Sequence, residues 1–323
     1  MVQWAPVELP RFLDSMPAGA PQVRFPSKAH SAATWRVRSS LRSVAPVAAA
    51  LTLAALAAVD VAAQPVAPHG DALYTPTPGQ IGKDVMWLGT PDSMVGAMLT
   101  AAGTGPGDTV ADLGAGDGRI AIAAARDFGA RAIGIEYDAK MAALAQRNAA
   151  RAGVADRVRI VEGDIFKEDF SQATVVTLYL LPELNLQLRP TILAMAPGTR
   201  VVSYQFTMSE WEPDRTIAAR PWDAYLWIVP ARVAGRWTVL DDAGRGVATL
   251  ELAQQFQKVG GTITFAGAPQ PLLGAALAGR ELRFTFVDRD GGVRNVRLVV
   301  DGDRAEGESR LGEHAVRWTA RRG

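Results

Sequence analysis

The chain has 323 residues, with 34 lysines and arginines against 33 aspartates and glutamates, three histidines and no cysteine. Without cysteine there can be no disulfide bond, no thiolate nucleophile and no zinc–sulfur site, and three histidines leave little material for a catalytic triad. We therefore expect no metal site. The length predicts two folded units rather than one.

The first 63 residues have the pattern of a leader followed by a signal peptide. Arginines at positions 36, 38 and 42 precede an apolar run over residues 44–59, and small residues end at Ala63. A basic region, an apolar region and a small-residue cleavage site together form a secretory signal. We expect cleavage near Ala63, an exported, periplasmic chain and no stable membrane span in the mature protein. The alternative is a membrane anchor over residues 44–59, although this run is short for a span.

The chain after the leader is nearly neutral in charge. Removing residues 1–63 leaves 28 of the 34 basic and 30 of the 33 acidic residues. No basic patch interleaved with aromatic residues is present, so we expect no nucleic-acid partner. Residues 64–80 are rich in proline and glycine and are predicted to be a linker.

A short segment over residues 82–91 precedes the first predicted strand. It reads Gly-Lys-Asp-Val-Met-Trp-Leu-Gly-Thr-Pro, and a helical pattern over residues 92–102 follows. Its position lets the segment lie over a ligand bound at the sheet, which makes Trp87 and Thr90 candidate contacts. The alternative for Trp87 is an ordinary core aromatic residue.

The most informative stretch is a glycine-rich turn between an apolar strand at residues 110–113 and a helix at residues 120–128. Three glycines let the backbone reach positive φ and approach a ligand closely. A dinucleotide fingerprint would need its third glycine at the position of Arg119, and no Gly-Lys-Ser/Thr of a phosphate loop follows. The spacing that remains is Asp-x-Gly-x-Gly-x-Gly over residues 112–118. A tight turn without a ligand is the alternative for the glycines alone.

Two further strands end in acidic residues. Glu136 ends the strand over residues 132–135, 24 residues after Asp112, where a carboxylate typically binds ribose hydroxyls in nucleotide-binding sheets. The strand over residues 158–161 is followed by Asp164 and Ile165. The carboxyl ends of parallel strands meet at one edge, so these side chains are predicted to share a site.

The order of elements predicts the fold. Strands at residues 174–180, 200–206 and 224–229 alternate with helices at 138–153 and 182–195. Over residues 81–232 this pattern predicts an α/β fold, a Rossmann-like, doubly wound and mainly parallel sheet. Residues 234–323 carry about six short alternating runs separated by glycine-rich turns, which predicts a C-terminal antiparallel β domain, a small sheet or barrel.

The Asp-x-Gly-x-Gly-x-Gly stretch resembles the first motif of class I S-adenosylmethionine-dependent methyltransferases. The segments Lys-Asp-Val-x-Trp-x-x-Thr-Pro (83–91) and Val-Val-Thr-Leu-Tyr-Leu-Leu-Pro-Glu-Leu-Asn (175–185) resemble a bacterial group of such proteins, similar to FAM173-type protein-lysine methyltransferases. The resemblance covers roughly residues 80–232. Gly89 departs from the family, which usually has proline there, so we expect a looser loop.

The resemblance implies that the cofactor is S-adenosyl-L-methionine. Asp112 is expected to brace the glycine turn, Asp117 to contact the ammonium group, Glu136 the ribose and Asp164 the adenine. The cofactor-binding residues implied in this way are Trp87, Thr90, Asp112, Gly114, Gly116, Asp117, Gly118, Glu136, Asp164 and Ile165.

The resemblance also implies a methyl acceptor near the end of the fourth predicted strand. The candidate catalytic residues there are Tyr179, Pro182, Glu183 and Asn185, although Glu183 is also typical of a solvated first helical turn. The acceptor implied by the relatives is a protein lysine amine, and a small-molecule acceptor is an alternative. A third hypothesis is an exported nucleoside-binding module without transferase activity.

Overall fold

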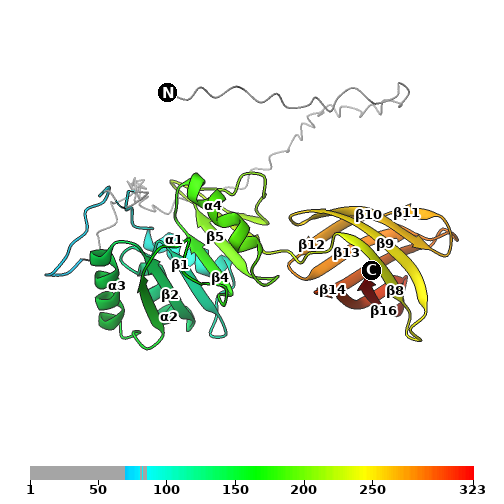
Figure 1. Ribbon diagram of the computed structural model, residues 1–323, viewed down its shortest axis with the longest axis horizontal. Coiled ribbons are helices and arrows are strands. Elements are labelled where there is room, and N and C mark those ends of the chain that lie inside the picture. The colour runs from blue at the N-terminus through cyan, green and yellow to red at the C-terminus, as the bar shows by residue number, and fades with distance from the viewer. Residues whose placement is uncertain (1–69, 81, 83–85) are drawn as a thin grey trace, which may run out of the picture. The chain divides into compact units, whose positions relative to one another are not determined.

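The structure is a computed structural model that describes residues 70–80, 82 and 86–323 (Figure 1). The predicted leader, its cleavage site near Ala63 and the apolar run at 44–59 lie outside the described residues, so export stays a prediction. Within the described part of the chain, no helix is both long enough and apolar enough to cross a membrane.

A seven-stranded sheet forms the first half of the described chain. Its strand order is β3-β2-β1-β4-β5-β7-β6; the strands from β1 to β5 pair in parallel, and β7 pairs antiparallel with β5 and β6. The strands are β1 (Thr109–Leu113), β2 (Arg131–Glu136), β3 (Val158–Glu162), β4 (Val175–Leu178), β5 (Arg200–Tyr204), β6 (Arg215–Ile217) and β7 (Ala224–Ile228). All except β6 were expected from the sequence.

Helices cover both faces of this sheet. The helices are α1 (Asp92–Ala101), α2 (Arg119–Phe128), α3 (Ala139–Arg151) and α4 (Pro182–Leu193). Successive strand residues point to opposite faces, so Val110 packs with α1, α2 and α3, whereas Ala111 packs with α4. Strands are added to one side of β1 as far as β3 and then, from β4 on, to its other side; ligands bind at such switch points, beyond the carboxyl ends of the strands.

A nine-stranded antiparallel sheet follows, in the order β11-β10-β9-β8-β16-β15-β14-β13-β12. It curls so that β10 also contacts β12, and it encloses its own apolar core (Figure 1). The strands are β8 (Gly235–Leu240), β9 (Gly246–Gln255), β10 (Lys258–Phe265), β11 (Pro269–Pro271), β12 (Leu273–Ala278), β13 (Glu281–Val287), β14 (Val293–Asp301), β15 (Arg304–Leu311) and β16 (His314–Arg322). The predicted fold class is confirmed, but the expected count of about six strands was wrong, since β11, β12 and β15 were missed.

The chain passes from one core to the next at Pro230. Val229 is buried in the core of the first sheet, whereas Ala231 and Val233 are buried in the core of the second. The predicted division into domains at residues 232–234 stays a prediction, and the buried side chains favour a boundary a few residues earlier.

Candidate functional site

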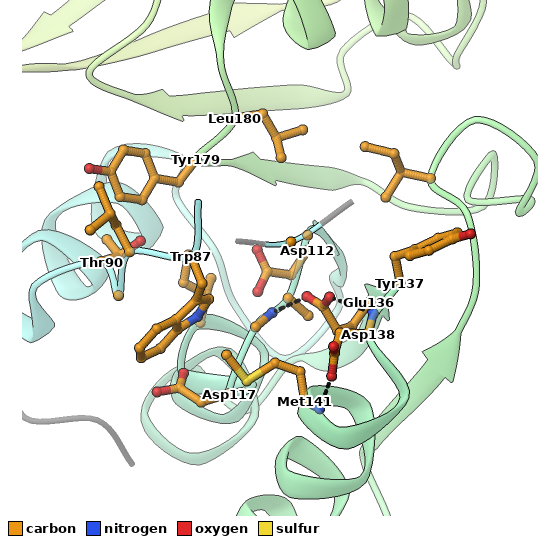
Figure 2. A pocket seen from close by; sticks show the side chains of 18 of the residues that line it. Trp87, Thr90, Asp112, Asp117, Glu136, Tyr137, Asp138, Met141, Tyr179 and Leu180 are labelled. Carbon is orange, nitrogen blue, oxygen red and sulfur yellow. Dashed lines mark hydrogen bonds between the residues drawn. The ribbon is translucent and has the colours of Figure 1, made fainter. Parts of the chain in front are cut away.

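A pocket opens at the carboxyl ends of β1, β2, β3 and β4, where the sequence placed its candidate residues (Figure 2). Its walls come from the segment before α1, the glycine turn, the ends of β2 and β4 and the first turn of α3. The predicted residues that line it are Trp87, Thr90, Asp112, Gly114, Gly116, Asp117, Glu136, Asp164, Ile165 and Tyr179.

The glycine turn leaves room for an aromatic side chain. Gly114 and Gly116 have φ values of +80° and +55°, which residues with a Cβ rarely adopt. A Cβ on Gly116 would lie 2.5 Å from Nε1 of Trp87. The indole therefore packs directly on the backbone of the turn, and Figure 2 shows Trp87 among the side chains that line the pocket.

The segment that carries Trp87 is anchored at two points. The backbone of Trp87 donates to the carbonyl of Gln80 and accepts from the amide of Gly79, both at 2.9 Å. Further upstream, the carboxylate of Asp71 accepts from Nε of Arg147 on α3 at 2.6 Å. These contacts hold the indole at the mouth of the pocket.

Glu136 links the glycine turn to the start of α3. Its Oε2 accepts from the amide of Gly116 at 2.7 Å, and its Oε1 accepts from the amide of Asp138 at 2.9 Å. Asp138 in turn caps α3 by accepting from the amide of Met141 at 2.8 Å. Burial raises the pKa of the Glu136 carboxyl despite these hydrogen bonds.

Asp112 lies beneath the turn and is almost fully buried. The hydroxyl of Thr177, its neighbour on β4, donates to Oδ1 at 2.7 Å. Burial, together with the negative charges of Asp117 and Glu136, raises the pKa of Asp112 to about 7. This hydrogen bond joins Asp112 to β4 rather than to the turn, so its bracing role stays a prediction; Thr177 is a partner that the sequence did not reveal.

Asp117 forms a buried ion pair that sequence reasoning missed. Nε of Arg119 donates to its two carboxylate oxygens at 2.9 and 3.2 Å, and Nη1 of Arg119 donates to the carbonyl of Thr90 at 2.9 Å. A Cβ on Gly89 would lie 2.6 Å from this guanidinium, so glycine at this position leaves room for the side chain of Arg119. The ion pair ties the segment before α1 to the glycine turn, so the expectation of a looser loop finds no support here.

The two ends of the pocket differ in polarity. One end holds carboxylates, and the other, at the end of β4, is mostly apolar. Figure 2 shows Tyr179 and Leu180 on the side of the pocket opposite Asp138 and Met141. The carboxylates are Asp112, Asp117, Glu136, Asp138 and Asp164; Tyr179, Leu180 and Leu184 follow β4, whereas the indole of Trp87 lies on the glycine turn.

Comparison with known proteins decides what kind of site this is. The family described as the ANTKMT methyltransferase domain matches residues 112–215. Over 151 residues the chain is 39% identical to a protein-lysine N-methyltransferase of Saccharolobus islandicus, and the match covers 45% of this chain and 94% of that protein. The chain belongs to the class I S-adenosylmethionine-dependent methyltransferases. The resemblance, the cofactor and the enzyme class predicted from the sequence are therefore confirmed.

Other similar proteins match over shorter or similar lengths. The methyltransferase is 33% identical to the adenine nucleotide translocase lysine N-methyltransferase of Mus musculus, over 40% of this chain and only 56% of the mouse protein. A solved structure, an RNA methyltransferase from Salinibacter ruber in complex with S-adenosyl-L-homocysteine, is 48% identical over 45% of this chain and 96% of its own, with a TM-score of 0.45.

The residues around the glycine turn of the methyltransferase are suited to bind its cofactor. The carboxylates around the glycine turn suit a ligand with sulfonium and ammonium charges, and Gly114, with its φ of +80°, lets the backbone after β1 line the pocket without a side chain. Glu136 would hold the ribose hydroxyls, Asp117 would face the ammonium group and Asp164 the adenine. These individual roles stay predictions.

Four predicted residues do not line the pocket. Gly118 begins α2 with a φ of +82°, close to Ala145. Pro182 and Glu183 are exposed in the first turn of α4. Asn185 is buried, where its Nδ2 donates to Oγ of Ser203 at 3.2 Å, and its Oδ1 has no hydrogen-bond partner among the described residues. Any role of these four residues in methyl transfer stays a prediction. The described residues contain no cluster of metal-binding side chains.

Proposed function

We propose that this methyltransferase transfers the methyl group of S-adenosylmethionine to the side-chain amine of a lysine in a protein. The observation that carries the proposal is the similarity to the Saccharolobus islandicus protein-lysine N-methyltransferase, 39% identical over 94% of that protein's length. The family match over residues 112–215 supports it, because it includes β4 and the start of α4.

The polarity of the pocket supports an amine acceptor. With the cofactor held at the carboxylate end, the acceptor enters at the end formed by Tyr179, Leu180 and Leu184. A lysine must lose a proton before its nitrogen can attack a methyl group. Apolar walls destabilise the ammonium form and so lower the pKa of the lysine.

The contribution of the protein to the reaction is modest. Bound S-adenosylmethionine supplies an electrophilic methyl group on its sulfonium sulfur. The residues of the pocket hold the acceptor nitrogen in line with this methyl group and exclude water from the path between them. No histidine is among the described residues that line the pocket, so water accepts the proton that leaves the lysine.

The identity of the methylated product tests the proposal. The purified enzyme, cell extract and S-adenosylmethionine with a tritium-labelled methyl group are incubated together, and the labelled products are analysed by mass spectrometry. We expect methylated lysine in one or a few proteins, and no label when excess S-adenosylhomocysteine is present. Label confined to RNA, to small molecules or to oxygen atoms would overturn the lysine acceptor but leave the methyltransferase in place.

A further inference from the structure

Tyr179 is contacted by three consecutive residues at the end of β5. Its ring centroid lies 4.8 Å from that of Tyr204, with the planes tilted by 56°, and 6.4 Å from that of Phe206 in a stacked arrangement. Between these two aromatic residues, Gln205 accepts a hydrogen bond from the Tyr179 hydroxyl through Oε1 at 3.2 Å. The side chain of Tyr179 is therefore enclosed from several sides at once.

A regular strand could not make these three contacts. Successive side chains of a strand point to opposite faces, so Gln205 would point away from the ring that Tyr204 and Phe206 contact. The alternation is broken because Gln205 has a φ of +68°, in the left-handed region that residues other than glycine rarely adopt. Its amide donates to the carbonyl of Asp223 at 2.8 Å, which helps to hold this conformation.

The fold itself does not call for glutamine at this position. Glycine adopts a φ of +68° without strain, and the side chain of Gln205 is only partly buried. Its side chain accepts the hydrogen bond from Tyr179, a residue that lines the pocket. Strained backbone is typically retained where it serves a functional site.

We infer that Gln205 is a positioning residue for methyl transfer, which holds the Tyr179 ring in place as a wall on the acceptor side of the pocket. The inference rests on the proposed entry of the acceptor at the Tyr179 end. Without the amide, the ring is free to shift, and the acceptor nitrogen is less often in line with the methyl group. Small displacements of this kind lower rates by about 10- to 100-fold.

The decisive variant is Gln205→Gly, since it removes the amide and also relieves the backbone strain. We expect an unchanged or higher melting temperature, unchanged affinity for S-adenosylhomocysteine by calorimetry, and a kcat about tenfold lower. The rate is measured as tritium transferred from labelled S-adenosylmethionine to all products of a cell extract, protein, RNA and small molecules together, at saturating extract. Gln205→Glu keeps an acceptor oxygen at the same distance along the side chain and is expected to retain most of the rate.

A matched control is Ala266→Gly, in the turn between β10 and β11. Ala266 is exposed and has a φ of +49°, so this change relieves similar strain far along the chain from Tyr179. It is expected to leave kcat unchanged. The variant Tyr179→Phe should lose about as much rate as Gln205→Gly, and combining the two should cost little more, because both remove the same hydrogen bond.

Two results would overturn the inference. One is a wild-type kcat in Gln205→Gly; the other is a loss of folding or of S-adenosylhomocysteine binding in that variant, which would mark a purely structural role. The ratio of the Gln205→Gly rate to the wild-type rate does not depend on which product carries the label. If mass spectrometry places the methyl groups elsewhere than on lysine, the proposed acceptor fails, while the ratio still tests the role of Gln205.

Discussion

The Glu136 carboxylate both lines the cofactor pocket and fixes the glycine turn through the amide of Gly116. We predict that Glu136→Ala weakens S-adenosylmethionine binding by about 1–3 kcal/mol, because we expect it to remove a charge-assisted hydrogen bond to a ribose hydroxyl. Glu136→Gln keeps an acceptor oxygen without the charge and should lose less. Calorimetry on the folded variants measures the effect, and an unchanged affinity in Glu136→Ala would exclude Glu136 from cofactor binding.

Asp112 makes the stability of the unliganded protein depend on pH. Its pKa is about 7 in the folded chain, against an ordinary value of 3.8 that applies after unfolding. Below the lower value both states carry the proton. Between the two values only the folded state keeps it, so the free energy of unfolding falls as the pH rises, by at most about 1.4 kcal/mol per pH unit, and levels off above the higher value.

The variant Asp112→Asn tests this dependence. Asparagine can still accept from the hydroxyl of Thr177 but cannot titrate. The stability of the variant relative to wild type should therefore rise between about pH 4 and about pH 7. Asp117 and Glu136 are present in both proteins, so the difference isolates Asp112. Parallel stability curves in denaturant across this range would contradict the raised pKa.

At the scale of elements, the ion pair of Asp117 and Arg119 joins the segment before α1 to the glycine turn. The two side chains are only 2% and 4% exposed. Arg119→Met would leave a buried carboxylate without its partner, and we predict a loss of about 3–5 kcal/mol in the free energy of unfolding. The double variant Asp117→Asn/Arg119→Met removes the charge as well and should be more stable than Arg119→Met alone. Urea denaturation measures both, and a double variant less stable than the single one would contradict this account.

Sequence patterns predicted the elements whose hydrophobic alternation is strong. Strand β15 was missed because it is rich in polar residues and contains Gly307. Its place in the sheet comes from its neighbours: Glu308 stands opposite Arg297 on β14 and Arg317 on β16. Such cross-strand pairs stabilise a strand only after its partners are known.

The candidate site shows the same contrast between residues that sequence patterns predict and residues that tertiary contacts place. Acidic residues at strand ends could be predicted to share a pocket, because parallel strands bring their carboxyl ends together. Arg119, Thr177 and Gln205 could not be found in this way, because their partners are fixed by tertiary contacts rather than by spacing along the chain. Asn185 shows the opposite case, since its position after β4 suggested the pocket, whereas its side chain contacts Ser203 on β5.

At the scale of the whole molecule, the two sheets differ in their relation to the activity. The Saccharolobus islandicus relative is covered to 94% by a match of 151 residues, whereas this chain has 323. A relative whose 151 matched residues make up 94% of its length is too short to contain both sheets. The residues that line the cofactor pocket all precede residue 185 and belong to the first sheet and its flanking segments.

We therefore predict that a fragment of residues 64–230 binds S-adenosylhomocysteine as tightly as residues 64–323. The fragment ends at Pro230 because Ala231 and Val233 are buried in the core of the second sheet and would be exposed without it. Calorimetry on the two proteins should give dissociation constants within about threefold, a difference of roughly 0.7 kcal/mol. Residues 231–323 alone serve as a control and should show β-sheet circular dichroism without binding. A fragment of residues 64–230 that is folded but binds more than about tenfold more weakly would mean that the second sheet supports the cofactor site.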